Sequence, residues 1–489
     1  MGTINNKIKT VIRNFLEIKE PQGLTINIEQ VGTHEVEVFK SIIWYRGEAT
    51  ELDSFYRQID DRTGNTHFWG SSSTVGQKIR KIHTGLPSLI VEVLTRVCID
   101  DLYSVKLSER QEEWDETAKE NNFSELVAQC VTDVLVQGDG AFKLSYDPEI
   151  SKLPIIEFYP AERVEYEYER GRLNGIIFKT QKHIRGKAYT LKEHYYEKAI
   201  TYSVIDFNGD EVDKASIPEF EKYQDIINTN SFIPAVKVMI TPSRKYKGRG
   251  KSIFSAKYDS FDSFDEVFSQ WMLAVRKGQI KEYIPSDLLP TNPENGEILQ
   301  YNYFDNDFIS IPLDMREGAT NKIETTQGQI QHEALLSSYV TALDLCLQGI
   351  ISPSTLGIDV KKLDNAEAQR EKEKTTLYTR SAVIGVLNKV IPELVIKTLK
   401  FIDNLNKTNG AEPEVTVNFG GYANPSFEAQ VETVGKAGQF GIMSIETSVE
   451  ELYGDTKDEK WKAEEVRRLK FEKGILEAEE PAINADVVS

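Results

Sequence analysis

Hydrophobic residues recur at helical spacing over the first 140 residues of the chain. Apolar side chains at positions 4, 8, 11, 12 and 15 predict a short amphipathic helix over residues 4–16. Helical regions are also expected from about 34 to 60 and from 75 to 98. A stronger helix begins at Asn122 and ends at Gly138-Asp139-Gly140, because glycine adopts the left-handed conformation that closes a helix.

The pattern then changes to short runs of β-branched and aromatic residues separated by turn residues. Strands are expected at 154–159, 163–168, 175–179 and, as one alternating run, 194–205. Asn208-Gly209 predicts a hairpin turn back toward Val212. Because no strand–helix–strand units are evident, the sequence predicts an antiparallel β region of roughly 100 residues within a helical protein, an α+β fold.

Beyond residue 255 the chain is predicted to form two helices with an irregular excursion between them. The first carries apolar residues three and four positions apart, the repeat of a helix that packs lengthwise against others; these are Phe261, Phe264, Phe268, Trp271 and Val275. The second is expected from about 329 to 349. The residues between them are rich in proline and aromatic side chains and predict loops and short strands. Spacing alone leaves open a core helix of a monomer or a helix at a subunit boundary.

A polar loop at 351–365 precedes a very long helical stretch, from Ala366 to about Asn404. At 1.5 Å per residue this stretch spans about 58 Å, more than a compact monomer of this size readily covers. Pro392 predicts a kink, because proline lacks the backbone N–H and its ring clashes with the preceding turn. A strand at 414–419 and a last helical region follow.

Composition narrows the class of protein. The 489 residues are 28% charged and 40% hydrophobic, values normal for a soluble protein of more than one domain. No segment approaches the roughly 18–20 uninterrupted apolar residues of a membrane span, and polar residues break up the N-terminal segment where a secretory signal would lie. The three cysteines, Cys98, Cys130 and Cys346, form no CxxC pair. A disulfide framework and a thiolate zinc site are therefore not expected, and a reducing cytoplasm fits best.

The formal net charge of −19 argues against tight wrapping of DNA, since that depends on lysine and arginine displacing counterions from phosphates. The charge is uneven. Residues 411–489 hold 17 acidic and 8 basic residues, and residues 284–325 hold 8 acidic and 2 basic ones. Against this, the segment Arg244–Lys251 places five basic residues in eight positions. It is equally compatible with a partner contact and with a solvated loop.

Two sequence motifs come close to known sites and fail. Gly250-Lys251-Ser252 resembles the end of a phosphate-binding Walker loop, but Lys245 stands where the first glycine is required. His332-Glu333 begins a zinc-protease motif, but Leu336 stands where its second histidine belongs.

Four acids on one predicted helix raise a further possibility. Asp259, Asp262, Asp265 and Glu266 could suggest a two-metal nuclease cluster, although a solvated helix face is the favoured interpretation. No nucleophile, base and orienting group come together in the sequence. We therefore predict no catalytic residue, no metal and no cofactor, and do not expect an enzyme.

The order of these segments resembles the portal proteins of tailed bacteriophages, particularly long-tailed phages of Gram-positive bacteria. The segments that carry the resemblance are, in chain order, Val136–Lys143, Phe158–Val164, Gly175–Phe178, Tyr246–Ile253, Ser263–Pro285, Ser352–Gly357, Asn365–Arg370, Gly441–Ser448, Glu451–Asp455 and Glu464–Lys470. No single motif is specific, and their collinear order carries the likeness. The short acidic tail after Glu472 departs from it.

The resemblance implies a portal fold with helical stem, antiparallel β-containing wing, small α/β clip and helical crown. The implied ranges are the wing (1–255), a first stem helix (256–283), the clip (284–324), a second stem helix (325–350), a tunnel loop (351–365), a long kinked wing helix (366–410), and a strand with crown and acidic tail (411–489).

The resemblance also implies roles for individual residues. The tunnel-loop residues implied to line a DNA channel are Ser352, Lys361, Lys362 and Asn365. The clip acids implied to dock partners are Asp305, Asp307 and Asp314. The aromatic repeat of the first stem helix would pack between the stem helices or at subunit boundaries. The alternative for the loop is a surface segment with merely solvated lysines.

The function implied is a structural ring at one capsid vertex, a channel for DNA packaging and ejection. Its implied partners are other copies of the chain (a dodecamer), double-stranded DNA, the terminase large subunit, a head–tail adaptor, and the major capsid and scaffolding proteins, with no membrane. The location would be the virion, after assembly in the host bacterial cytoplasm. The alternatives are a monomeric cytosolic scaffold or binding protein and, less favoured, a DNA-processing enzyme.

Overall fold

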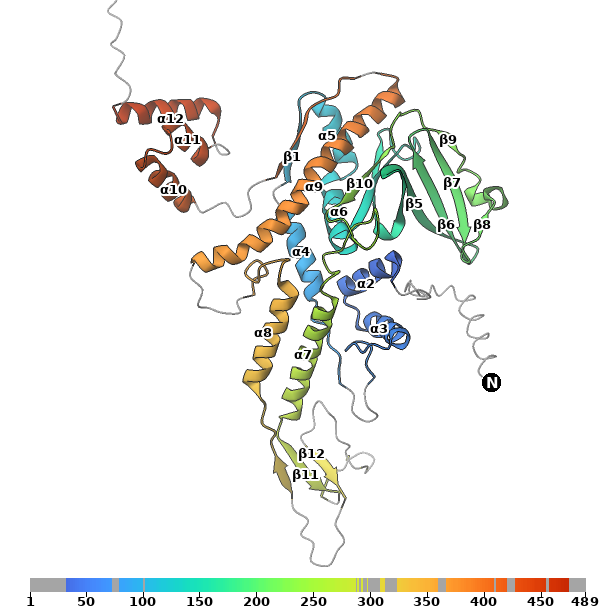
Figure 1. The fold of residues 1–489 in the computed structure, drawn as a ribbon, viewed down its shortest axis with the longest axis vertical. Coiled ribbons are helices and arrows are strands. Elements are labelled where there is room, and N and C mark those ends of the chain that lie inside the picture. The colour runs from blue at the N-terminus through green and yellow to red at the C-terminus, as the bar shows by residue number, and fades with distance from the viewer. Residues whose placement is uncertain are drawn as a thin grey trace, which may run out of the picture. The chain divides into compact units, whose positions relative to one another are not determined.

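The computed structural model shown in Figure 1 describes most of the chain. The described residues are 32–72, 79–99, 102–286, 288–289, 292, 297, 308–312, 323–358, 366–408, 410–419, 427–453 and 457–474. They form two compact units that divide at residue 420. The helix predicted at 4–16 lies outside them. None of the helices among these residues is long and apolar enough to cross a membrane.

The first unit begins with helices. In chain order they are α2 (His34–Arg46), α3 (Ala49–Thr63), α4 (Leu86–Ile99), α5 (Gln111–Glu120) and α6 (Phe123–Gln137). The single helical region predicted at 34–60 is two helices, because Gly47 adopts φ +70° and ends α2. The helix predicted from 75 begins only at Leu86; the described residues before it, 79–85, are not helical.

Two antiparallel sheets follow. One orders its strands β10 (Ala235–Met239), β2 (Asp139–Ser145), β3 (Ile155–Pro160). The other orders them β4 (Val164–Glu169), β5 (Arg172–Ile184), β6 (Lys187–Tyr196), β7 (Ala199–Asp206), β8 (Glu211–Val212), with β9 (Ile226–Ile227) also pairing with β7. The run predicted as one strand at 194–205 is wrong, because the chain reverses between β6 and β7. The predicted hairpin toward Val212 is confirmed, with Val204 paired to Val212.

Two helices joined through a small sheet come next. Helix α7 (Tyr258–Lys277) leads into β11 (Lys281–Pro285), and β13 (Glu324–Thr326) leads into α8 (His332–Leu347). Strand β11 pairs antiparallel with β13 and parallel with β12 (Phe308–Ile311). Figure 1 shows α7 and α8 side by side, with β11 and β12 beyond their ends.

Helix α9 (Ala366–Asn406) contains 41 residues and confirms the predicted long helix; it is about 62 Å long at 1.5 Å per residue. Its assignment is continuous through Pro392, and the kink there stays a prediction. The helix packs against α4 and β10, and against β14 (Val415–Phe419), which pairs antiparallel with β1 (Leu102–Leu107). The predicted strand at 414–419 therefore belongs to the first unit.

The main hydrophobic core lies where these helices meet the β10-β2-β3 sheet. Its buried side chains come from α2, α4, α6, α8 and α9 and from the first half of α7, and include Trp44, Leu94, Val131, Phe261, Leu343 and Ile391. Since helices pack on an antiparallel sheet and, among the described residues, no helix joins parallel strands of one sheet, the predicted α+β class is confirmed.

The second unit has three described helices, α10 (Phe427–Gln439), α11 (Ile445–Tyr453) and α12 (Glu459–Glu472). Tyr453 and Trp461 pack ring to ring at 5.0 Å, and Lys462, buried, forms an ion pair with Glu450. The helical region predicted near the C-terminal end is thus confirmed.

A buried ion pair joins the two sheets of the first unit to the loop before α7. Asp139, fully buried at the start of β2, accepts hydrogen bonds from Nε and Nη2 of Arg249, each at 3.0 Å, and from the Gly250 N–H. Arg249 also donates to the carbonyls of Ala161 and Val164. A side chain at Gly250 would collide with the Gly138 backbone, so only glycine fits there.

This arrangement restricts the two predicted interpretations of the loop 244–251, a partner contact or a solvated loop, to its basic residues other than Arg249. Arg249 is an internal cross-link, because its guanidinium satisfies one buried carboxylate and two backbone carbonyls at once. The remaining basic residues of the loop stay on the surface.

The Asp139–Arg249 pair makes a stability prediction. Asp139→Ala leaves a largely buried guanidinium without its counter-ion, and we expect a loss of about 3–5 kcal/mol of unfolding free energy in denaturant titrations. The control is Arg163→Ala, whose side chain is 62% exposed and lies 3.9 Å from Glu162; it should change stability by less than about 0.5 kcal/mol. Equal unfolding midpoints for the two variants would contradict the assigned role.

Candidate functional site

The α7–α8 pair is the structural feature that corresponds best to the aromatic repeat seen in the sequence. The ring of Tyr339, on α8, lies 5.0 Å from Phe264, 6.2 Å from Phe268 and 5.6 Å from Trp271. Trp271 also lies 6.0 Å from His332. Aromatic pairs of this kind contribute about 0.5–1.5 kcal/mol each beyond the area they bury. Three of the five predicted stem-packing residues thus converge on one side chain of α8.

The other two residues of the repeat behave differently. Phe261 packs against Trp44 and Phe254 in the main core rather than against α8. Val275, near the end of α7, is 40% exposed. Helix α7 therefore changes its surroundings along its length, from the core at its start to water near its end.

Apolar side chains also remain exposed on α8. Leu336 is 43% exposed and Leu345 51% exposed. They are nine residues apart, so at about 100° per residue they point to opposite sides of the helix. The pair is consequently sealed on one face and leaves apolar side chains in water on others.

Two carboxylates on α7 hold a segment of the chain that lies between α3 and α4 and includes Phe68, Trp69, His83 and Thr84. Asp262, 8% exposed, accepts the backbone N–H groups of Phe68 and Trp69 at 2.8 and 3.1 Å. Burial raises the pKa of this carboxyl, and the two backbone N–H groups partly oppose that shift.

Asp265 is 1% exposed and accepts four further hydrogen bonds. The donors are Nε1 of Trp69, Nδ1 of His83 and both the N–H and the hydroxyl of Thr84, at 2.7 to 3.1 Å. One helix residue thus fixes two places in the segment, fifteen positions apart. The predictions of a solvated acidic face and of a nuclease cluster are both wrong for Asp262 and Asp265, because their oxygens are taken by protein donors.

The His83–Asp265 pair has the composition of a catalytic acid–base dyad but not its surroundings. The outer ring nitrogen of His83, Nε2, is buried with no hydrogen-bond partner. It faces Gly47, where even a Cβ atom would come within 2.8 Å of it. No nucleophile or substrate could reach that nitrogen, and the pair serves packing between Trp44 and Trp69.

No group of three or more histidine, cysteine, aspartate or glutamate side chains in the described part of the chain could hold a metal ion. All three cysteines are buried. Burial raises the pKa of the Cys98 and Cys346 thiols to about 12, so neither is a reactive thiolate near neutral pH.

Of the residues predicted to line the channel or to dock partners, the structure describes only Ser352. Ser352 is 2% exposed; its N–H donates to the Thr376 hydroxyl and its own hydroxyl pairs with that of Ser354. Its side chain is therefore turned into the protein, and its implied role in a channel stays a prediction. Lys361, Lys362 and Asn365 lie outside the described residues, as do the clip acids Asp305, Asp307 and Asp314.

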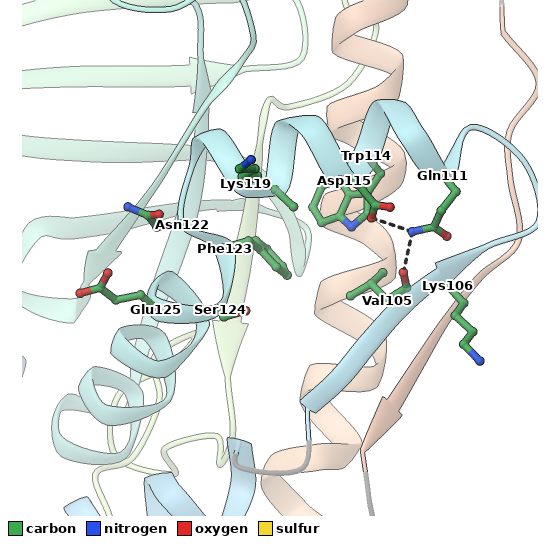
Figure 2. Close-up of a pocket in the computed structure, with 11 residues that line it drawn as sticks. Val105, Lys106, Gln111, Trp114, Asp115, Lys119, Asn122, Phe123, Ser124 and Glu125 are labelled. Atoms are coloured by element: carbon green, nitrogen blue, oxygen red, sulfur yellow. Dashed lines mark hydrogen bonds between the residues drawn. The ribbon is translucent and has the colours of Figure 1, made fainter. Parts of the chain in front are cut away.

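A groove of about 810 Å³ lies between β1, α5 and the start of α6 (Figure 2). Gln111 follows the outer edge of β1: its Nε2 donates to the Val105 carbonyl at 3.1 Å and its Oε1 accepts the Leu107 N–H at 2.7 Å. The amide thus takes the bonds that an added strand would make. The charged residues on the walls, two lysines, one aspartate and one glutamate, are mixed in sign and favour no ion.

Sequence reasoning overlooked the Asp262–Asp265 anchor, although a signal was present. Tyr258, Asp262, Asp265 and Ser269 are spaced four, three and four residues apart, so they share one helix face with a buried tyrosine. It also overlooked Tyr339, which only the pairing of α7 with α8 brings to the aromatic repeat.

No family model matches the chain, and no curated protein matches its sequence. A chain from the virion of a native gene transfer agent particle aligns with 84% of this chain and 98% of its own length, at 12% identity and a TM-score of 0.38.

Two further structures come from necks of such particles. One, from a native particle computed with C12 symmetry, aligns with 76% of this chain and 91% of its own, at 10% identity and a TM-score of 0.41. The other, from an empty particle computed with C6 symmetry, aligns with 79% and 95%, at 11% and 0.37. All three TM-scores are below 0.5, so the likeness does not establish a shared fold.

The anchor on α7 makes a second prediction. Asp265→Ala removes the acceptor of four hydrogen bonds, one buried and three partly buried, and we expect it to cost at least about 3 kcal/mol of unfolding free energy. Faster amide exchange should appear in residues 67–72 and 79–84. Asp259→Ala, an exposed acid on the same helix, is the matched control and should change neither quantity. Unchanged exchange in Asp265→Ala would show that the carboxylate does not hold the segment.

Proposed function

We propose that this chain is a structural subunit of a phage or phage-like particle, and specifically a portal subunit that forms a ring around a DNA channel. The observation that carries the proposal is the α7–α8 pair. Its helices are joined through the small β11–β13 sheet, sealed by aromatic side chains on one face, and apolar but uncovered elsewhere.

Ring formation explains the uncovered faces. In a closed ring each subunit contacts two neighbours through two different surfaces, so a helix that lines the ring needs apolar side chains on two sides. Leu336 and Leu345 satisfy this requirement on α8. A monomeric scaffold would gain nothing from leaving these side chains in water.

In this proposal the other parts of the chain take the roles that the sequence resemblance implies. The helices α7 and α8 are the stem, β11–β13 belong to the clip, α9 belongs to the wing, and α10–α12 are the crown. The residues 351–365 are the tunnel loop. The partners are DNA, the terminase large subunit, the head–tail adaptor, and the capsid and scaffolding proteins.

The net charge of the chain supports a channel rather than a DNA clamp. A conduit must let phosphates slide, and a subunit with 77 acidic against 58 basic residues has no excess of cations to grip them. The acidic clip, with Asp305, Asp307 and Asp314, would present a docking surface to the motor and later to the adaptor. Charges at the rim of such an interface act mainly on association rate and salt dependence.

The ring is tested by the exposed leucine of α8. Leu345→Glu places a charge where a neighbouring subunit should pack, so we expect monomers or incomplete rings in place of a particle of about 670 kDa for twelve copies of the 55.5 kDa chain. Sizing with light scattering and electron microscopy would measure this. Leu345→Met, which keeps the surface apolar, should assemble normally. Intact rings from Leu345→Glu, or a monomeric wild type, would refute the proposal.

The channel is tested by the paired lysines of the tunnel loop. Lys361→Glu combined with Lys362→Glu should leave ring assembly intact and reduce the length of DNA retained in particles, because a weak, salt-screened contact to phosphates is lost. The control is the same charge change at two exposed lysines on and after α9, Lys389→Glu with Lys407→Glu. Full-length DNA in particles of the loop variant would exclude these lysines from the mechanism.

A further inference from the structure

A second cavity of the first unit, of about 600 Å³, lies between the start of α2 and the loop that precedes α7. Basic side chains line it, although the chain as a whole is acidic: Arg244, Lys245 and Lys251 stand on its walls. Its volume falls within the roughly 300–1,000 Å³ of small-molecule sites. Neither the fold of the first unit nor the proposed ring function accounts for this concentration of positive charge.

The cations of the cavity are largely uncommitted. Arg244 and Lys251 are exposed and form no ion pair or side-chain hydrogen bond with any described residue. Lys245 lies with its Nζ 4.9 Å from the ring centre of Tyr246, whose hydroxyl donates to the carbonyls of Gly32 and Thr33. Tyr246 thereby fixes the basic loop against the first residues before α2.

A buried amide faces the same space. Gln137, 7% exposed, lines the cavity and uses its Oε1 to accept the Glu162 N–H. Its Nε2 makes no hydrogen bond with the described residues and is not fully buried, so this donor is open to the cavity.

The charge balance of the lining favours a dianion. Glu37 is the lining carboxylate, which leaves three cations against one anion. His34 adds no charge at neutral pH, since burial and the nearby Arg249 lower its pKa to about 4. It can still donate one N–H. The net of two positive charges matches a phosphomonoester, whose second ionisation lies near pH 6.

We propose that this cavity binds a phosphate group, held by the side chains of Arg244, Lys245 and Lys251 with Gln137 behind them. The site is not a Walker loop. The Gly250 N–H is already bonded to Asp139 and the Lys251 N–H to the Thr241 carbonyl, so the backbone donors that a Walker loop aims at phosphate are occupied. Recognition here uses side chains on a loop that the Asp139–Arg249 pair holds rigid.

Phosphate can reach this site from two sources, a free phosphate ester or the backbone of DNA. The experiment titrates the full-length protein at low salt with inorganic phosphate, with adenosine diphosphate and with a short DNA duplex, measured by calorimetry. We expect at least one of the three to bind. The proposal does not depend on ring formation, and sizing of every variant reports that property separately.

The decisive variant is Arg244→Gln with Lys251→Gln. Both residues are exposed, so we expect unchanged melting, and affinity for the bound probe should fall about tenfold or more because two charge-assisted contacts are lost. Lys247→Gln is the matched control: it removes a cation from the same loop that does not line the cavity, and affinity should stay within about twofold.

The possible results distinguish the two sources of phosphate and also test the proposal itself. Binding of phosphate or the diphosphate that only the double variant loses supports a free ester as ligand, and binding of DNA alone with the same pattern supports a backbone phosphate. No binding of any probe at low salt overturns the proposal. So does an equal loss in Lys247→Gln, which would reflect general surface charge rather than this cavity.

Discussion

Helix α7 is held in place by carboxylates that lie on the same stretch of helix as its aromatic residues. Asp262 and Asp265 are buried because backbone and side-chain donors of residues 68–84 saturate their oxygens. Without those donors, two adjacent buried carboxylates would be too costly to keep in the core. The described residues 67–72 and 79–84, between α3 and α4, therefore depend on α7 for their position, and α7 depends on them. These few hydrogen bonds join residues that lie nearly two hundred positions apart in the sequence.

This constraint explains how one helix can serve two environments. The first half of α7 is fixed by Tyr258, Phe261 and the two acids, all buried. The second half carries Phe268 and Trp271, which pack against Tyr339 and, for Trp271, also against His332 on α8. Because the anchored half determines the direction of the axis, the free half can project apolar surface without support from the core. Such surface is a liability in a monomer and useful in an assembly.

A buried ion pair fixes the loop before α7 against the two sheets in a similar way. The hydrogen bonds of Asp139 and Arg249 connect β2, the turn before β4 and the loop before α7. Because Arg249 is held inside, the cations Arg244, Lys245 and Lys251 of that loop lie on the surface around one cavity. The acidic net charge of the chain and the local basic cavity therefore coexist, since screening confines each to its own neighbourhood at physiological salt.

The sequence by itself determined the elements that repeat regularly. Helix α6, the long α9, the aromatic repeat of α7 and the β-hairpin at Asn208-Gly209 all follow from periodicity and turn chemistry, which are local properties. Whether an individual polar residue is buried or exposed was decided only by the tertiary structure. Asp265 and Asp259 look alike in the sequence, yet one is buried against Trp69 and His83 and the other is exposed. Arg249 and Lys247 differ in the same way. Whether a charge is buried depends on whether distant donors or acceptors reach it, and that is fixed only when the whole chain has packed.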